Sequence, residues 1–213
     1  MALFPRNAAA PACIAVVLAS AAAFAAEPAA KKLGPGQQSI HLEATSAAAD
    51  YKTQTAEYKD IVIRDDDIKV QADRAHAAGL DMDNTQWTFE GNVRVQSEQR
   101  GSLHSDQAIV EFRNNRIAKV TVAGSPAEFE QKRADSEQMT HGHAGQIVYD
   151  VNDGTVRLSK DAWLSDGRNE ISSELLVYNM REQKVQGSAP AGTDGRVHIT
   201  ISPGGKLEPS KQP

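Results

Sequence analysis

Short segments in which apolar and polar residues alternate recur along this chain, separated by turn residues. The clearest pair is Trp87–Val95 and Leu103–Phe112, and weaker copies follow as far as Tyr178. A period of two is the pattern of a half-buried β-strand, because successive side chains point to opposite faces of a sheet. The alternation predicts an all-β fold whose stacked units make one long apolar surface rather than a catalytic cleft.

The predicted strands are short, evenly spaced and about 16 in number, which is typical of a sandwich, barrel, jelly roll or β-solenoid. The run Asn152–Gly154 between two such segments is a strong hairpin signal. Gly91, Gly124 and Gly187 interrupt strand patterns, and Lys160 takes the equivalent place in a third unit. An isolated glycine in a strand indicates a bulge or bend, so we expect the chain to turn corners there.

The N-terminus has the features of a secretory signal peptide. Arg6 is the only charged residue before Glu27, the run Ala12–Phe24 is apolar, and an A-x-A motif ends at Ala25. These features predict cleavage after Ala25 and export, the alternative being an uncleaved membrane anchor. Cys13 lies within this segment, so the mature domain is expected to lack disulfides and to depend on its own core.

The rest of the chain divides by composition. Residues 26–57 are rich in Ala, Lys, Gln, Pro and Gly and are predicted to be a flexible lead-in, in which Ala47–Ala49 could form a short helical piece. Residues 58–201 form the predicted β domain, and 202–213 a disordered tail. The formal net charge of −5 gives no reason to expect nucleic-acid binding.

The alternation also assigns an inner face to the β domain, with mostly charged or polar residues between its members. These side chains form either a closed core or the lining of an apolar trough. The residues predicted to line the interior are Ile68, Val70, Phe89, Val93, Val95, Val110, Phe112, Phe129, Ile147, Tyr149, Val151, Leu158, Leu176 and Tyr178.

The segment Arg196–Ile201 alternates regularly, contains neither Pro nor Lys, and ends at Pro203. Exposed edges of soluble proteins are usually blunted, so this edge predicts pairing with another chain, with Ile61–Ala72 as the complementary edge. The alternative places the strand inside the sheet. The predicted edge side chains are Ile61, Ile63, Ile68, Val70, Val197, Ile199 and Ile201.

No residue pattern indicates catalysis or a cofactor. His141 and His143 would share one face of a strand but lack a recognisable third metal ligand, and Asp65–Asp67 lacks the glycine and distal glutamate of a calcium loop. No nucleophile-elbow motif occurs, and nothing in the spacing brings Glu90 and Glu111 together. We therefore expect no catalytic residue, metal or cofactor.

Five segments resemble, in order, motifs of a known family. Thr88–Val93 resembles T-F-x-G-N-V, Ser105–Gln107 stands at an A-D-K position, and Pro126–Phe129 resembles P-A-x-F. Gly142–Tyr149 resembles G-H-A-x-x-φ-x-Y, and Tyr178–Gly187 resembles the end of the domain. Each motif is short, but their ordered combination resembles the OstA-like family of lipopolysaccharide-transport proteins.

The resemblance implies a twisted, open antiparallel β-jelly roll that holds the acyl chains of lipopolysaccharide, with Phe129, Tyr149, Val151, Ile68 and Val70 as the best trough residues. It also implies a periplasmic, non-enzymatic protein. Its copies would stack head to tail, from LptC of an inner-membrane transporter complex to the N-terminal domain of LptD in the outer membrane.

The chain departs from the family pattern in a longer lead-in and in Ser159–Asp161, where the family has T-G-N. Three functions compete with the bridging carrier: an LptC-like membrane-anchored component, a carbohydrate-active enzyme on a β-solenoid, and an assembly module that holds no lipid.

Overall fold

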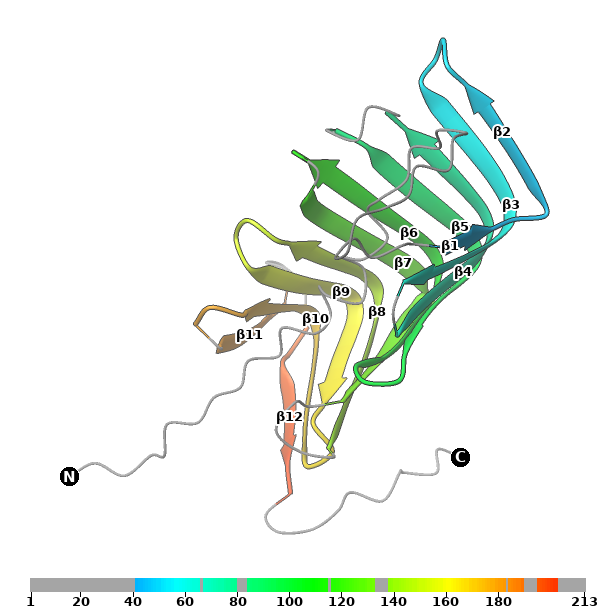
Figure 1. Ribbon diagram of the computed structural model, residues 1–213. Coiled ribbons are helices and arrows are strands. Elements are labelled where there is room, and N and C mark those ends of the chain that lie inside the picture. Colours follow the sequence, from blue (N-terminus) through cyan, green and yellow to red (C-terminus); the bar gives the residue numbers. More distant parts are fainter. Residues whose placement is uncertain are drawn as a thin grey trace, which may run out of the picture.

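The structure, a computed structural model, describes residues 41–65, 67–79, 84–114, 116–132, 138–182, 184–189 and 195–202. These residues form one antiparallel sheet of twelve strands (Figure 1). None of them lies in a helix long and apolar enough to cross a bilayer. The strands are β1 (His41–Glu43), β2 (Ser46–Asp50), β3 (Thr55–Asp65), β4 (Ile68–Ala78), β5 (Gln86–Ser97), β6 (Gly101–Arg113), β7 (Arg116–Lys132), β8 (Met139–Asp150), β9 (Thr155–Ser165), β10 (Asn169–Asn179), β11 (Lys184–Ser188) and β12 (His198–Ile201).

Strands β3 to β10 pair with their neighbours in chain order, so the sheet is a meander. Each end of the sheet carries two short strands against one long strand. At one end, β1 and β2 both pair with β3; at the other end, β11 and β12 both pair with β10. Every ladder is antiparallel, which is why hairpin turns of a few residues suffice to join the long strands.

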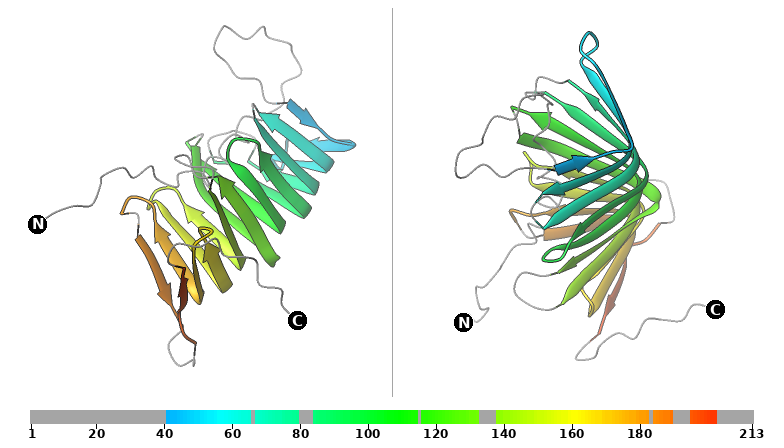
Figure 2. Two further views of the ribbon diagram at one scale, coloured as in Figure 1. Left: turned by 90° about the horizontal axis from the view of Figure 1, so that it is seen from below. Right: turned by 45° about the vertical axis from the view of Figure 1, so that its right-hand side comes forward.

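Most of the long strands bend once near the middle. The pairing register shifts at corresponding points in the ladders from β4–β5 to β9–β10. At these points the backbone is left-handed at Gly91 (φ 74°), Asn92 (φ 48°), Lys160 (φ 65°) and Asp161 (φ 56°). Because bulges bend a strand, their alignment folds the single sheet into two walls that meet along one side (Figure 2).

The bends explain why about 16 strands were predicted where the described residues form twelve: β5 (Gln86–Ser97) was expected as two strands divided at Gly91. The corners predicted at Gly91, Gly124 and Lys160 coincide with register shifts. The corner predicted at Gly187 does not, because this residue pairs regularly with Leu176. A Cβ there would lie 2.8 Å from the Val197 side chain, so Gly187 leaves room for that side chain.

A second correction concerns the predicted lead-in, because residues 41–57 contain β1, β2 and the start of β3. Ala47–Ala49 belong to β2 and not to a helix. Strand β3 offers a row of backbone donors and acceptors, and pairing with it outweighs the helix propensity of alanine, which is a weak preference. The predicted signal peptide and the tail from 203 lie outside the described residues.

One continuous hydrophobic core fills the space between the walls. Its side chains come from β3 to β10, and Phe89, Ile61, Ile147 and Val95 are 2% exposed or less. Full burial of a side chain of this size is worth about 1.5–3 kcal/mol, so this core is the main source of stability in a domain without disulfides.

Candidate functional site

The inner face of the first wall is one apolar row that crosses the whole sheet. Cross-strand partners share a face, so the register alone traces the row from strand to strand. It consists of Leu42, Ile63, Val70, Val95, Leu103, Phe129, Gly142, Leu164, Ile171 and Ile199. At Gly142 the Phe129 ring occupies the space that a Cβ would need, so the apolar surface is unbroken there.

The second wall carries two parallel rows of the same kind. Tyr58 stacks on Trp87 at 5.7 Å and Trp87 on Phe89 at 5.8 Å, so aromatic rings line its N-terminal part. One row consists of Ala47, Tyr58, Ala75, Phe89, Ala108, Val122, Ile147, Leu158, Leu176 and Gly187, and the other of Ala49, Ala56, Ala77, Trp87, Val110, Val120, Tyr149, Val156, Tyr178 and Val185.

Burial changes along these rows. Val95 and Val120, in the middle of two of the rows, are 0% and 1% exposed, whereas Ile199 at the end of the first row is 62% exposed. The three rows therefore form an apolar interior that is closed in the middle and reaches solvent at the ends of the sheet. This surface from one end of the molecule to the other is the candidate functional site.

Two tyrosines from the sequence prediction lie at one edge of this interior. Burial raises the pKa of the Tyr149 hydroxyl, with a further contribution from Asp150 that Arg181 opposes. Burial alone raises the pKa of Tyr178. Both hydroxyls are therefore neutral near pH 7 and able to donate or accept a hydrogen bond.

Every residue predicted to line the interior belongs to the core or packs against it, and all are buried except Val151 and Tyr178, which are half-buried. Their contact with lipid stays a prediction. Trp87, Leu103, Val120 and Val122 also belong to the core and were missed. Trp87 was recognisable from the sequence, because it alternates with Phe89 in the same strand.

The two predicted edges have different outcomes. Val197, Ile199 and Ile201 are exposed at the edge of the sheet, where β12 pairs with β10 as its one partner among the described strands. Ile61 and Ile63, by contrast, lie in β3, and Ile68 and Val70 lie in β4. Strand β4 pairs on both sides, so that part of the edge prediction is wrong. The edge is formed by β1 and β2, which the alanine-rich sequence did not reveal.

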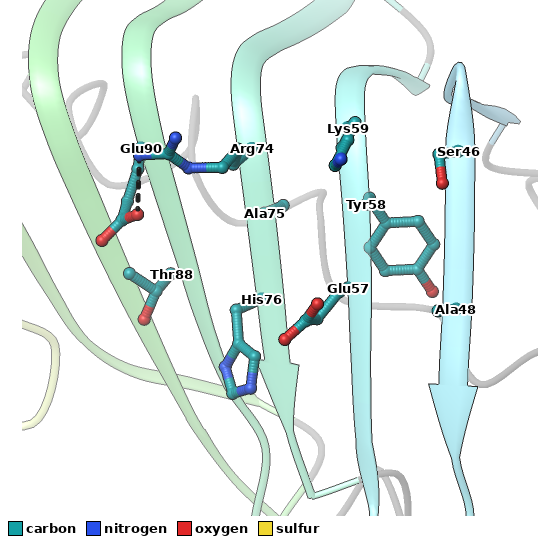
Figure 3. A pocket seen from close by; sticks show the side chains of 10 residues that line it. All are labelled: Ser46, Ala48, Glu57, Tyr58, Lys59, Arg74, Ala75, His76, Thr88 and Glu90. Carbon is teal, nitrogen blue, oxygen red and sulfur yellow. Dashed lines mark ion pairs between the residues drawn. The ribbon is translucent and has the colours of Figure 1, made fainter.

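A cavity of about 430 Å³ lies on the outer face of β2 to β5 (Figure 3). Its lining side chains alternate along the strands with inward residues such as Tyr58 and Ala75. Arg74 and Glu90 in its lining form an ion pair at 3.5 Å between the neighbouring strands β4 and β5. The opposite charges in the lining offset one another, so this cavity selects no particular charged ligand. The outward lining residues are Ser46, Ala48, Glu57, Lys59, Arg74, His76, Thr88 and Glu90.

The two histidines considered as metal ligands have other contacts on the outer face. His141 Nδ1 lies 3.5 Å from Glu130 Oε1, and the His143 ring stacks on Trp163 at 5.2 Å. Within the described ranges, no three His, Cys, Asp or Glu side chains are grouped as metal ligands would be.

Residues 70–184 match the family model described as LptA/(LptD N-terminal domain) LPS transport protein, which is more than half of the 213-residue chain. The chain belongs to this family. In the LptA/LptD N-terminal family it is similar to the lipopolysaccharide export system protein LptA of Escherichia coli strain K12. The two are 28% identical over 130 residues, which cover 60% of this chain and 68% of that protein.

A second relative is the lipopolysaccharide export system protein LptH of Pseudomonas aeruginosa, which is 27% identical over 150 residues. These residues cover 68% of this chain and 84% of that protein. A crystal structure of LptH is described as the LptA homologous periplasmic component of the conserved lipopolysaccharide transport device. Its superposition on this chain has a TM-score of 0.49 at 23% sequence identity and covers 78% of this chain and 96% of that chain.

Proposed function

We propose that this protein is a periplasmic carrier that holds the acyl chains of lipopolysaccharide between its two walls. The observation that carries the proposal is that the apolar rows run without a charged residue from β1 and β2 to β11 and β12. A closed core needs no such continuity to the ends of the sheet, whereas a lipid conduit does. Membership of a lipopolysaccharide-transport family supports the same ligand.

The energetics favour a carrier of this shape. Each acyl CH₂ transferred out of water contributes about 0.8 kcal/mol, so a lipid with several chains does not cross an aqueous compartment unaided at a useful rate. Acyl chains between the walls would separate the side chains that now contact one another. The ligand thereby replaces apolar contacts with similar ones, and the walls move apart about the aligned bends.

We further propose that copies assemble head to tail and that the same ends pair with LptC at the inner membrane and the LptD N-terminal domain at the outer membrane. The pair β11 and β12 at one end and the pair β1 and β2 at the other each leave one edge unpaired within the described sheet. Pairing between them would join the row that ends at Ile199 to the row that begins at Leu42, so the apolar interior would continue into the next copy.

A photo-crosslinking residue at Tyr149 in the exported protein tests the carrier proposal. Tyr149 faces the interior from β8, and Gln146 in the same strand belongs to an outward row, so Gln146 is a matched control. We expect a lipopolysaccharide adduct at Tyr149 and none at Gln146. A folded, exported protein without an adduct at Tyr149, Phe129 or Val151 would favour the assembly module.

An anchored component and an enzyme differ from the carrier in features that can be observed directly. An LptC-like anchored component would retain its N-terminal apolar segment, which sequencing the N-terminus of the mature protein would detect. The enzyme alternative assumed a β-solenoid fold, whereas the observed sheet is an antiparallel meander.

A further inference from the structure

The hairpin between β6 and β7 ends in two arginines that face each other. Arg113 is the cross-strand partner of Arg116, and both side chains are exposed. No acidic side chain among the described residues forms an ion pair with either. Like charges placed directly opposite each other on adjacent strands are destabilising, so this pair needs a reason beyond the fold.

The other described hairpins of the same wall close differently. In the β2–β3, β8–β9 and β10–β11 hairpins, the last paired residues of the first strand are Asp50, Asp150 and Asn179, and four residues separate each from its partner. Each of these three side chains accepts hydrogen bonds from the backbone N–H groups two and three residues later. The β6–β7 hairpin extends two residues of β6 beyond this level, where Glu111 lies, and only two residues separate its last pair, which consists of two cations.

The arginine pair directly follows the last inward pair of the hairpin, and the alternation places both arginines on the outer face. Phe112 precedes Arg113 and is 5% exposed, and its partner Ile117 follows Arg116 and packs against the core. This hairpin lies at the free ends of the strands, on the side opposite the bends (Figure 2). One residue step, about 3.4 Å, therefore leads from buried apolar side chains to two guanidinium groups in solvent.

We propose that Arg113 and Arg116 bind the phosphate of a lipid headgroup whose acyl chains lie in the interior. This inference rests on the proposed function. Acyl chains next to Phe112 and Ile117 place the headgroup at the hairpin, because the headgroup stays in water. A guanidinium group binds phosphate through two parallel hydrogen bonds, and an anion between the two arginines removes their mutual repulsion.

Two titrations of the full-length exported protein test the site, one with diphosphoryl lipid A and one with the same lipid after removal of both phosphates. We expect the wild-type protein to bind the diphosphoryl form roughly tenfold more tightly, as charge-assisted bidentate hydrogen bonds would provide. The double variant Arg113→Ala/Arg116→Ala should lose this preference. Its affinity for the dephosphorylated lipid should stay within about twofold of wild type, because the apolar contacts are unchanged.

Matched variants test whether the effect is specific to these two arginines and whether the double variant remains folded. Arg157→Ala removes an exposed arginine from an outward row of β9 and should keep the preference. Arg113→Lys/Arg116→Lys should retain part of it, since lysine keeps the charge but not the two parallel hydrogen bonds. The double alanine variant should melt no lower than wild type, because it removes a like-charge pair.

Inorganic phosphate distinguishes a lipid headgroup from a free anion. Inorganic phosphate should displace the diphosphoryl lipid only weakly. If micromolar phosphate displaced the lipid, the pair would be a site for free phosphate, and the lipid assignment would be overturned. Equal losses for both lipids, or no loss of preference in the double variant, would overturn the inference while leaving the carrier function intact. Failure of the wild-type protein to bind either lipid would overturn the proposed function and the inference together.

Discussion

At the scale of single residues, the bend between the walls depends on backbone conformations that few side chains adopt. Gly91 has φ of 74°, and an added Cβ would contact the Asp73 carboxylate, which accepts a hydrogen bond from Asn92 Nδ2 at 2.9 Å. The glycine thus provides both the left-handed backbone and the close approach of β4 to β5. The residues that shape the interior are therefore partly on its outside, at the bends.

Gly91→Ala should destabilise the protein by about 2–3 kcal/mol, since the left-handed conformation costs about 1 kcal/mol and the contact with Asp73 adds to it. Gly167→Ala is the matched control, because Gly167 also has positive φ (83°) but its added Cβ would meet nothing closer than 3.8 Å. Urea unfolding of both variants measures the difference. Equal losses of unfolding free energy would show that the approach of β4 to β5 is not tight.

At the scale of the strand, the two faces of β12 differ in chemistry. Ile199 and Ile201 are 62% and 70% exposed and continue the inner face, whereas Thr200 between them points to the outer face. Such a strand leaves apolar side chains and backbone groups without a partner at the end of the sheet. Assembly with another copy would bury both.

Ile199→Lys/Ile201→Lys should give a folded monomer, because charged side chains would have to enter the joined interior. Thr200→Lys adds a charge to the same strand on its outer face and should leave assembly unchanged. Light scattering across a concentration series reports the oligomer, and circular dichroism reports the fold. Oligomers of wild-type size in the double variant would contradict assembly through this edge.

At the scale of the whole molecule, stability and binding surface are segregated. The long strands β3 to β10 hold the fully buried residues, and the ends hold short strands with one partner each among the described strands. Local unfolding is easiest where few apolar contacts and few neighbouring strands hold the backbone. The ends should therefore be the least protected parts of a single copy, and assembly should protect them.

Hydrogen exchange should show this segregation. In dilute protein, amides of β2, β11 and β12 should exchange fastest and those of β5 to β8 slowest; in concentrated, assembled protein the end strands should become protected while the middle stays unchanged. The Ile199→Lys/Ile201→Lys variant should show no such dependence on concentration. End strands equally protected in dilute and assembled wild-type protein would contradict pairing through the ends.

The β-fold, the inner face and most of the bends follow from the amino-acid sequence alone. Alternation marks Phe89, Val93 and Val95 as inward because side-chain direction in a strand depends on local geometry alone. Gly91 and Gly124 mark the bends for the same reason, since the constraint on φ or on close approach is local. The ordered motifs from Thr88 to Gly187 were enough to indicate the family.

The three-dimensional fold was needed to show which strands are long, where the sheet ends and what the hairpins present to solvent. Strands β1 and β2 form because they pair with the edge of β3. The alanine-rich sequence of this segment does not indicate that contact. The opposition of Arg113 and Arg116 depends on the register of β6 and β7, and the continuity of three apolar rows depends on the register of every ladder. Register is a property of pairs of strands, so no single segment of the sequence contains it.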